Sequence, residues 1–288
     1  MSSNKQFNLE ELKALVFEQN QATKQNKDKL FKLAKAEKDI ECIERLRDEL
    51  GFKAAKMYLD KQGNLSLEDA IKNRDVENFK NFIEAGASLS KINMNELIDK
   101  KYDDEFIKVL IKKGFYVNIA NLIRKKYTLE TIRLALNSGA NVNETYNNLT
   151  GVAYSAIDGE KDILKLLLVD YKANPNIQFS HGLTALVSVA GGNSDNVEIV
   201  KLLLDNGSEI NKQVFNGFTA LIFAAESNNI KIVKLLLDYG ADVNMQTANK
   251  GTALILAVVK NHIKVAELLL EYKADINIED IHGVNALG

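Results

Sequence analysis

The residues that could carry out chemistry are few in this chain and lie far apart. The histidines are His181, His262 and His282, and Cys42 is the single cysteine. His181 and His282 precede glycines in similar turns 101 residues apart, so a shared metal ion or a catalytic pair is not expected. We expect His262 to bond the backbone between the two helices of its own structural unit, and Cys42 to be a small buried hydrophobic residue. The sequence therefore predicts no catalytic residue, no metal site and no cofactor.

Nucleotide and nucleic-acid binding find little support in the motifs. Gly191 and Gly192 do not lead into the Lys-Ser/Thr pair of a phosphate-binding loop. Basic residues recur on consecutive segments further upstream, where they would either align into a positive stripe or lie on a solvated face. We favour the solvated face because acidic residues alternate with them, and nucleic acid is not the expected partner. The basic residues are Lys100, Lys101, Lys112, Lys113, Arg124, Lys125 and Lys126, and the acidic ones are Asp103, Asp104 and Glu105.

Aromatic side chains occur in several turns where a merely solvated chain would be polar. Aromatic residues are enriched among the strongest contributors to protein–protein binding, because a rigid ring buries much area at a small entropic cost. The alternative is that these rings pack onto their own helices, and the sequence leaves both interpretations open. The residues predicted to bind a protein partner are Tyr146, Phe179, His181, Phe215, Asn216, Phe218, Phe223, Glu226 and Asn249.

These candidate residues lie in or beside a repeated sequence. Residues 217–244 return nearly in register as residues 250–277, and Thr219 and Thr252 are 33 residues apart. A self-similarity of this period is typical of stacked supersecondary units rather than of one globular core. The repeat therefore predicts an extended array of small units.

Each unit is predicted to be a helix hairpin with one apolar side. A short apolar helix follows Thr219 and ends at Asn228-Asn229. A second helix carries an apolar stripe over residues 232–237 at helical spacing, and Gly240 stands where a left-handed residue ends a helix. The apolar side of such a hairpin can be buried only against neighbouring hairpins, so we expect the units to stack.

The motifs that open and close the units resemble those of the ankyrin-repeat family. Thr-Ala-Leu opens units at Thr184, Thr219 and Thr252, and Gly-Ala-Asp-Val-Asn closes one from Gly240. The proline that usually follows the threonine is absent. The resemblance is dense over about residues 150–288 and degenerate over about 65–149. It implies an all-α ankyrin-repeat solenoid of stacked helix hairpins with projecting turns, in which the turns and the first helices form a concave surface that binds a partner protein.

The two ends of the chain differ from this pattern. Residues 1–62 are predicted to form a helical N-terminal region, either a degenerate repeat that caps the array or an independent helical domain. The repeats then occupy residues 63–288, and they are expected to be shortened before about residue 145. Residues 280–287 begin a further, incomplete repeat, so either the natural chain is longer or a partner covers the last full unit.

Composition narrows the class of protein. The 288 residues are 46% apolar and 26% charged, and 37 basic against 39 acidic residues leave a net charge of −2. This balance gives no general attraction for nucleic acid or anionic membranes. A single cysteine excludes an internal disulfide framework and suits a reducing compartment. No apolar run is long enough to span a bilayer and no signal-peptide core is present, so we expect a cytoplasmic protein.

The function predicted from the sequence is a non-enzymatic adaptor that binds a partner protein. Asn/Lys/Ile-rich chains with degenerate repeats are similar to effectors of intracellular bacteria, protists and large viruses, so delivery into a host cell is a further hypothesis. One alternative is an effector enzyme or ligase adaptor whose activity lies in residues 1–62. It is disfavoured because that segment holds no histidine and only Cys42 as a nucleophile. Another alternative is a homo-oligomer that assembles through the C-terminal end of the array.

Overall fold

The chain is divided into two compact units, residues 1–93 and residues 94–288. In the first unit, helix α5 (Val76–Glu84) buries Phe79 and Ile83. The predicted helical region 1–62, with Cys42, lies outside the residues that the structure describes, and its separate role stays a prediction. The computed structural model describes residues 70–84, 89–90, 92–192 and 196–287.

The second unit consists of short helices connected by turns. Its elements are α6 (Met94–Asp99), α7 (Asp104–Lys112), α8 (Ile119–Arg124), α9 (Leu129–Asn137), β1 (Thr145–Tyr146), β2 (Leu149–Thr150), α10 (Gly151–Ile157), α11 (Lys161–Lys165), the π-helical turn η1 (Leu166–Asp170), the 3-10 turn η2 (Ser180–Gly182), α12 (Ala185–Ala190), α13 (Val197–Asp205), the 3-10 turn η4 (Phe215–Gly217), α14 (Ala220–Glu226), α15 (Ile230–Asp238), α16 (Ala253–Val259) and α17 (Ile263–Glu271).

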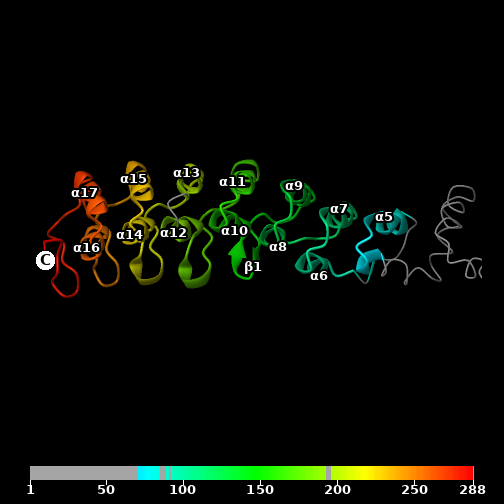
Figure 1. The fold of residues 1–288 in the computed structure, drawn as a ribbon, viewed down its shortest axis with the longest axis horizontal. Helices are drawn as coiled ribbons and strands as arrows, with labels where there is room; N and C mark the ends of the chain where they lie inside the picture. The colour runs from blue at the N-terminus through cyan, green and yellow to red at the C-terminus, as the bar shows by residue number, and fades with distance from the viewer. Residues whose placement is uncertain (1–69, 85–88, 91, 193–195, 288) are drawn as a thin grey trace, which may run out of the picture. The chain divides into compact units, whose positions relative to one another are not determined.

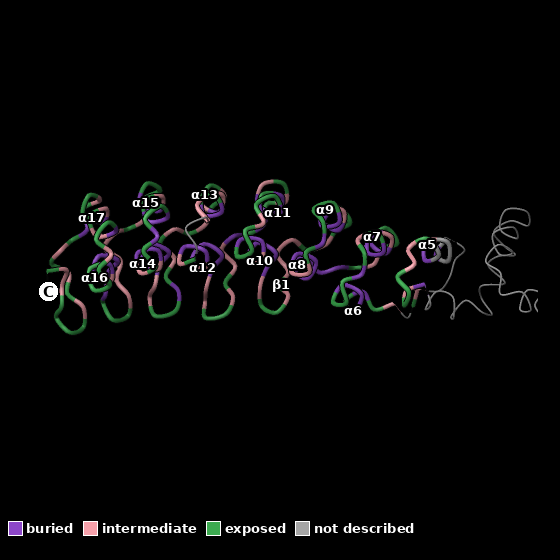
Figure 2. Tube along the Cα trace, viewed as in Figure 1, coloured by how far each residue is buried: buried purple, intermediate pink, exposed green. Residues whose placement is uncertain are grey.

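The helices of the second unit lie in two rows (Figure 1). Helices α6, α8, α10, α12, α14 and α16 form the inner row, from whose side the turns project, and α7, α9, α11, α13, α15 and α17 form the outer row. Most helices pack on their hairpin partner and on the next helix of their own row, as α14 does on α15 and α16. The apolar residues lie between neighbouring hairpins, whereas the tips of the turns are mostly exposed (Figure 2).

A threonine begins each full inner helix and fixes where it starts. Thr150, Thr184, Thr219 and Thr252 have extended backbones, and each side-chain oxygen accepts a hydrogen bond from the backbone N–H three residues later. Such a cap satisfies a backbone donor that the first turn of a helix leaves free, and it typically contributes about 1 kcal/mol. All four threonines are buried, so the caps lie inside the array rather than on its surface.

Neighbouring units are also joined by side-chain amides at the start of the projecting turns. The Oδ1 of Asn211 accepts from the backbone N–H of Asp242 (2.9 Å), and Asn244 accepts from Asp275 in the same way (2.8 Å). Asn143 and Asn176 make the equivalent bonds upstream. Each bond crosses from one unit to the next, so the series ties successive units together at the same place.

One outer helix contains an extra residue. Compared with the segment around α15, the segment after α11 has one additional residue, and the helix absorbs it as the π-helical turn η1. The backbone N–H of Tyr171 there donates to the carbonyl of Leu166 (3.2 Å), one residue further back than in an α-helix. The apolar residues 166–168 consequently stay buried although the chain is one residue longer.

The all-α array of stacked helix hairpins predicted from the 33-residue repeat is confirmed. The predicted left-handed residue at Gly240 has a φ of 86°. One element was not predicted: β1 and β2 form a two-residue antiparallel ladder that pairs Thr145 with Thr150 and Tyr146 with Leu149. Within the described residues, every helix is too short or too polar to cross a membrane.

Candidate partner-binding surface

Three projecting turns carry most of the predicted binding residues, and we call them fingers. Finger A is residues 177–183, finger B is residues 212–218 and finger C is residues 245–251. Each finger is closed across its base by a backbone bond: in finger B the N–H of Val214 donates to the carbonyl of Phe218 (2.9 Å). The tips reverse direction through left-handed residues, so they are held in one conformation by their own backbone.

The tips of fingers A and B meet through two rings. His181 and Asn216 occupy equivalent left-handed positions, with φ of 60° and 58°. The imidazole of His181 lies edge-on to the ring of Phe215, with centroids 5.8 Å apart and an interplanar angle of 60°. The Phe215 side chain is 60% exposed and His181 is exposed as well. A large apolar ring kept in solvent on an ordered turn is typical of a contact surface.

A second pair of rings lies in the angle between finger B and the inner helix that follows it. The rings of Phe218 and Phe223 are 4.7 Å apart and tilted by 39°, and both residues are half-buried. Phe223 also packs across to the preceding unit, where a Cβ added to Gly191 would lie 3.4 Å from the Phe223 Cβ. The glycine thus leaves room for this ring. The rings of Phe218 and Phe223 are thus packed within the chain, whereas Phe215 is exposed, and its contact with a partner stays a prediction.

Fingers B and C are linked by their backbones. The N–H of Ala248 donates to the carbonyl of Asn216 (2.7 Å), and the Gln213 side chain donates to the carbonyl of Gln246 (2.9 Å). Gly217 lies against this contact: a Cβ there would come within 3.0 Å of the Ala248 nitrogen. Fingers B and C are therefore joined into one continuous structure, which we call a ledge. This link was not predicted, because its main bond joins backbone atoms and leaves no mark on the side-chain pattern.

The remaining predicted residues divide between this surface and other contacts. Asn249 is exposed at the tip of finger C, and its carbonyl accepts from the N–H of Ile281 (3.1 Å). Phe179 is half-buried in finger A. Glu226 is the last residue of α14, the helix that carries Phe223. It pairs with Lys260 of the next unit (2.8 Å), and the Glu226 side chain is 30% exposed.

Tyr146 lies apart from the aromatic fingers, in a polar cluster of the earlier units. Its hydroxyl is 3.2 Å from both carboxylate oxygens of Asp99, and the Arg124 guanidinium lies 4.9 Å from its ring centroid. Arg124 also pairs with Asp99 (2.7 Å), and the Tyr154 hydroxyl donates to the Tyr146 carbonyl (3.1 Å). The polar groups of Tyr146 are thus already satisfied within the chain.

Several basic residues of the early units are paired with acidic side chains. Lys100 pairs with Glu96 (2.6 Å), and Lys126 pairs with Asp158 (2.5 Å) and Glu160 (3.1 Å). Burial acts to lower the pKa of Lys126, but these two acidic partners raise it overall. Lys100, Arg124 and Lys126 are thus paired with acidic residues of the chain, whereas Lys112 and Lys113 are exposed, and the solvated face stays a prediction.

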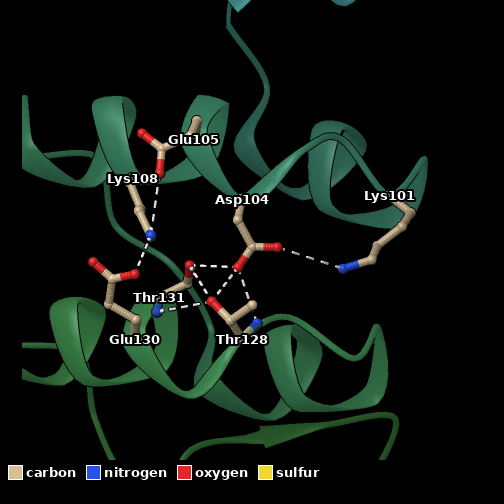
Figure 3. Close-up of polar contacts among 7 residues, drawn as sticks. All are labelled: Lys101, Asp104, Glu105, Lys108, Thr128, Glu130 and Thr131. Carbon is tan, nitrogen blue, oxygen red and sulfur yellow. Dashed lines mark hydrogen bonds and ion pairs between the residues drawn. The ribbon is translucent and has the colours of Figure 1, made fainter.

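A further polar network joins α7 to α9 in the outer row (Figure 3). The Asp104 carboxylate accepts bonds from the backbone N–H of Thr128 (2.9 Å) and from the hydroxyls of Thr128 (2.5 Å) and Thr131 (2.6 Å). The mostly buried Lys108 lies between Glu105 (3.1 Å) and Glu130 (2.5 Å). These groups satisfy one another, so the network is a structural tie between units.

The prediction for His262 needs a correction. Its Nδ1 lies 3.0 Å from the carbonyl oxygen of Ala225, which belongs to the preceding unit and not to its own. Asn229 occupies the equivalent position one unit earlier, and its amide likewise reaches the carbonyl of Gly192 (3.4 Å). The side chain at this position spans the unit boundary because the free carbonyls at the end of the previous inner helix face it.

The groups that could take part in chemistry lie dispersed over the described residues. In the described ranges, no group of three or more His, Cys, Asp or Glu residues could hold a metal ion. His181, His262 and His282 belong to different units, as the sequence predicted. What the surface offers instead is a row of ordered fingers with rings in solvent beside an inner row of helices.

The family model for ankyrin repeats (3 copies) matches residues 100–214 and 187–280, which together span more than half of the chain. The chain belongs to the ankyrin-repeat family. The predicted resemblance is therefore confirmed, and the match begins at residue 100, inside the region where the motifs are degenerate. Ankyrin repeats are protein–protein interaction modules and are generally not enzymes. No curated protein matches the chain.

Family membership identifies the fingers as parts of the repeat. Fingers A, B and C are the projecting turns of consecutive ankyrin repeats, and α12, α14 and α16 are the first helices of those repeats. The repeats indicate a protein partner. Which residues contact that partner follows from this chain's own side chains.

Proposed function

We propose that this chain is a non-enzymatic adaptor that docks a folded partner protein on fingers A to C and on the adjoining faces of α12 and α14. The observation that carries the proposal is the ordered, solvent-exposed contact between His181 and Phe215 at the finger tips. The packed rings of Phe218 and Phe223 also support the proposal, since they hold finger B against the inner helix that follows it. Because these rings are already ordered, binding a partner costs little conformational entropy at this surface.

Phe179, Asn216 and Asn249 belong to the proposed surface as neighbours of the rings on the three fingers. Glu226 lies at its border, where Lys260 already holds its carboxylate. Tyr146 is the weakest member, because its hydroxyl and ring have partners inside the chain. We therefore place the centre of the surface at fingers A and B.

Affinity capture with the intact chain tests the proposal. The Phe215→Ala/Phe218→Ala double variant should lose its captured proteins, because removal of a hot-spot ring typically costs 2 kcal/mol or more, about thirtyfold in affinity. Phe215→Ala alone is expected to fold normally, since the side chain is 60% exposed. It separates lost binding from lost stability.

Ile263→Ala is the matched control, because Ile263 is an equally exposed apolar residue (61%) on α17 of the outer row. If the double variant and the control capture the same proteins as the parent chain, the proposed surface is wrong. Action as a host-directed effector stays a hypothesis that composition alone supports, and the alternative of activity in residues 1–62 lies outside the described residues.

A further inference from the structure

Fingers A to C and their inner helices contain almost no acid, whereas the next turn, which bonds to finger C through Ile281, carries Glu279 and Asp280. Residues 177–192, 212–227 and 245–260 comprise fingers A to C with their inner helices, and Glu226 is the one acidic residue among them. The whole chain holds 39 acidic residues against 37 basic ones, so this depletion is local. A surface without carboxylates does not repel an acidic partner.

The basic groups of the same surface are not all engaged. Lys260 holds Glu226 (2.8 Å), and Lys212 pairs with Glu209 (3.2 Å). Lys250 is exposed at the tip of finger C, and it forms no ion pair with any residue that the structure describes. Its backbone N–H donates to Thr247, so the tip is ordered while the ammonium group stays in solvent.

A backbone bond joins the finger that carries this cation to the finger that carries Phe215. Ala248, two residues before Lys250, donates to the carbonyl of Asn216, which follows Phe215 directly (2.7 Å). His181 lies on the other side of Phe215, with centroids 5.8 Å apart. Across three consecutive fingers the tips thus present an imidazole, an aromatic ring and an ammonium group.

Several charged groups of the earlier repeats are already paired, although Lys112, Lys113 and Tyr116 there are exposed. The Asp99–Arg124 and Lys126–Asp158 pairs are examples. A partner that docked there would have to replace existing ion pairs. A partner on fingers A to C would instead meet the exposed Lys250 without displacing an ion pair of that residue.

We infer that the segment docked on fingers A to C is an acidic protein segment in which a carboxylate lies close in sequence to an aromatic or large aliphatic anchor. This inference rests on the proposed function. The anchor packs on the His181–Phe215 pair while the carboxylate meets Lys250 one finger further along. A single-stranded nucleic acid fits less well, since tracking its phosphates requires several cations and finger C supplies one.

A selection experiment tests the inference on the intact chain. A displayed library of random short peptides is selected on the labelled protein, and the selected peptides are then titrated by fluorescence polarisation. We expect them to combine Asp or Glu with Phe, Trp, Tyr or Leu. Lys250→Glu should weaken their binding about fivefold, as expected for reversing one exposed ion pair. Lys264→Glu, the same change at an exposed position of the outer helix α17, should leave it unchanged.

The results separate this inference from the proposed function. Selected peptides that are basic or uncharged, or an unchanged affinity in Lys250→Glu, overturn the acidic partner; the proposed function stands if Phe215→Ala still weakens binding about tenfold. Competition by single-stranded polyuridine also overturns the acidic partner. If no selected peptide depends on Phe215, the inference fails, and affinity capture with Phe215→Ala/Phe218→Ala decides the proposed function separately.

Discussion

At the scale of single residues, the Asp104 side chain joins helix α7 to the start of helix α9. One of its carboxylate oxygens accepts three hydrogen bonds from Thr128 and Thr131, and the other oxygen lies 3.9 Å from the Lys101 ammonium. Burial acts to raise the pKa of Asp104, but the hydrogen bonds from both threonines hold it below its usual value. The ionised form therefore stabilises the contact between α7 and α9.

This lowered pKa gives a stability prediction with a definite sign. A carboxyl group whose pKa is lower in the folded state contributes stability above its unfolded pKa of about 3.9, and that contribution is lost as the pH falls through the folded pKa. At pH 7, Asp104→Asn should lower the free energy of unfolding by about 2 kcal/mol, because it removes a charged acceptor shared by three donors. Urea unfolding curves measure this loss.

The gap between the parent chain and Asp104→Asn should shrink as the pH drops below about 4, because the parent then becomes neutral too. Asp103→Asn serves as the control, since the Asp103 side chain is exposed and makes no capping bond at the start of α7. A gap that is the same at pH 7 and at pH 3 would show that the charge of Asp104 is not what matters.

At the scale of elements, the fingers are rigid because they are bonded to one another as well as to themselves. Finger B is joined to finger C through Asn216 and Ala248, whereas it meets finger A through the rings of Phe215 and His181. Gly217 has a φ of 76°. A Cβ added to it would lie 3.0–3.2 Å from the backbone of residues 247–248. Gly182 has a similar φ of 72°, but nothing lies within 4 Å of its added Cβ.

This difference predicts unequal effects of the same substitution. Gly182→Ala should cost about 1–2 kcal/mol, because only the left-handed backbone penalises alanine. Gly217→Ala should cost about 3 kcal/mol or more, since its methyl group must also push finger C away against backbone contacts. Denaturant unfolding compares the two variants, and amide exchange at Ala248 reports whether its bond to Asn216 has opened. Equal losses of stability would contradict the view that fingers B and C form one ledge.

The sequence predicts the elements of the late repeats well, and the reason is local. The threonine caps, the apolar stripe over residues 232–237 and Gly240 each act within one hairpin, so their spacing is visible in the chain. The aromatic character of the fingers is visible for the same reason. Contacts between repeats are harder to predict: His262 bonds to the preceding repeat, and Tyr146 is held by Asp99, 47 residues earlier.

At the scale of the whole molecule, the repeats of the second unit differ between their two halves along the inner row. In the earlier half, charged side chains such as Arg124 and Lys126 are paired inside the chain. In fingers A to C and their inner helices, Glu226 is the one acidic residue, and Phe215, His181 and Lys250 are among the exposed residues. Because successive repeats share one backbone plan, this difference in side chains is what supports the proposed binding at the later half.

Hydrogen exchange of the intact chain, alone and with the protein that it captures, tests this account most directly. We predict slower exchange of backbone amides in fingers A and B and in the adjoining inner helices α12 and α14, with little change in the outer helices α13 and α15. Protection confined to α13 and α15, with fingers A and B exchanging as in the free chain, would contradict the account.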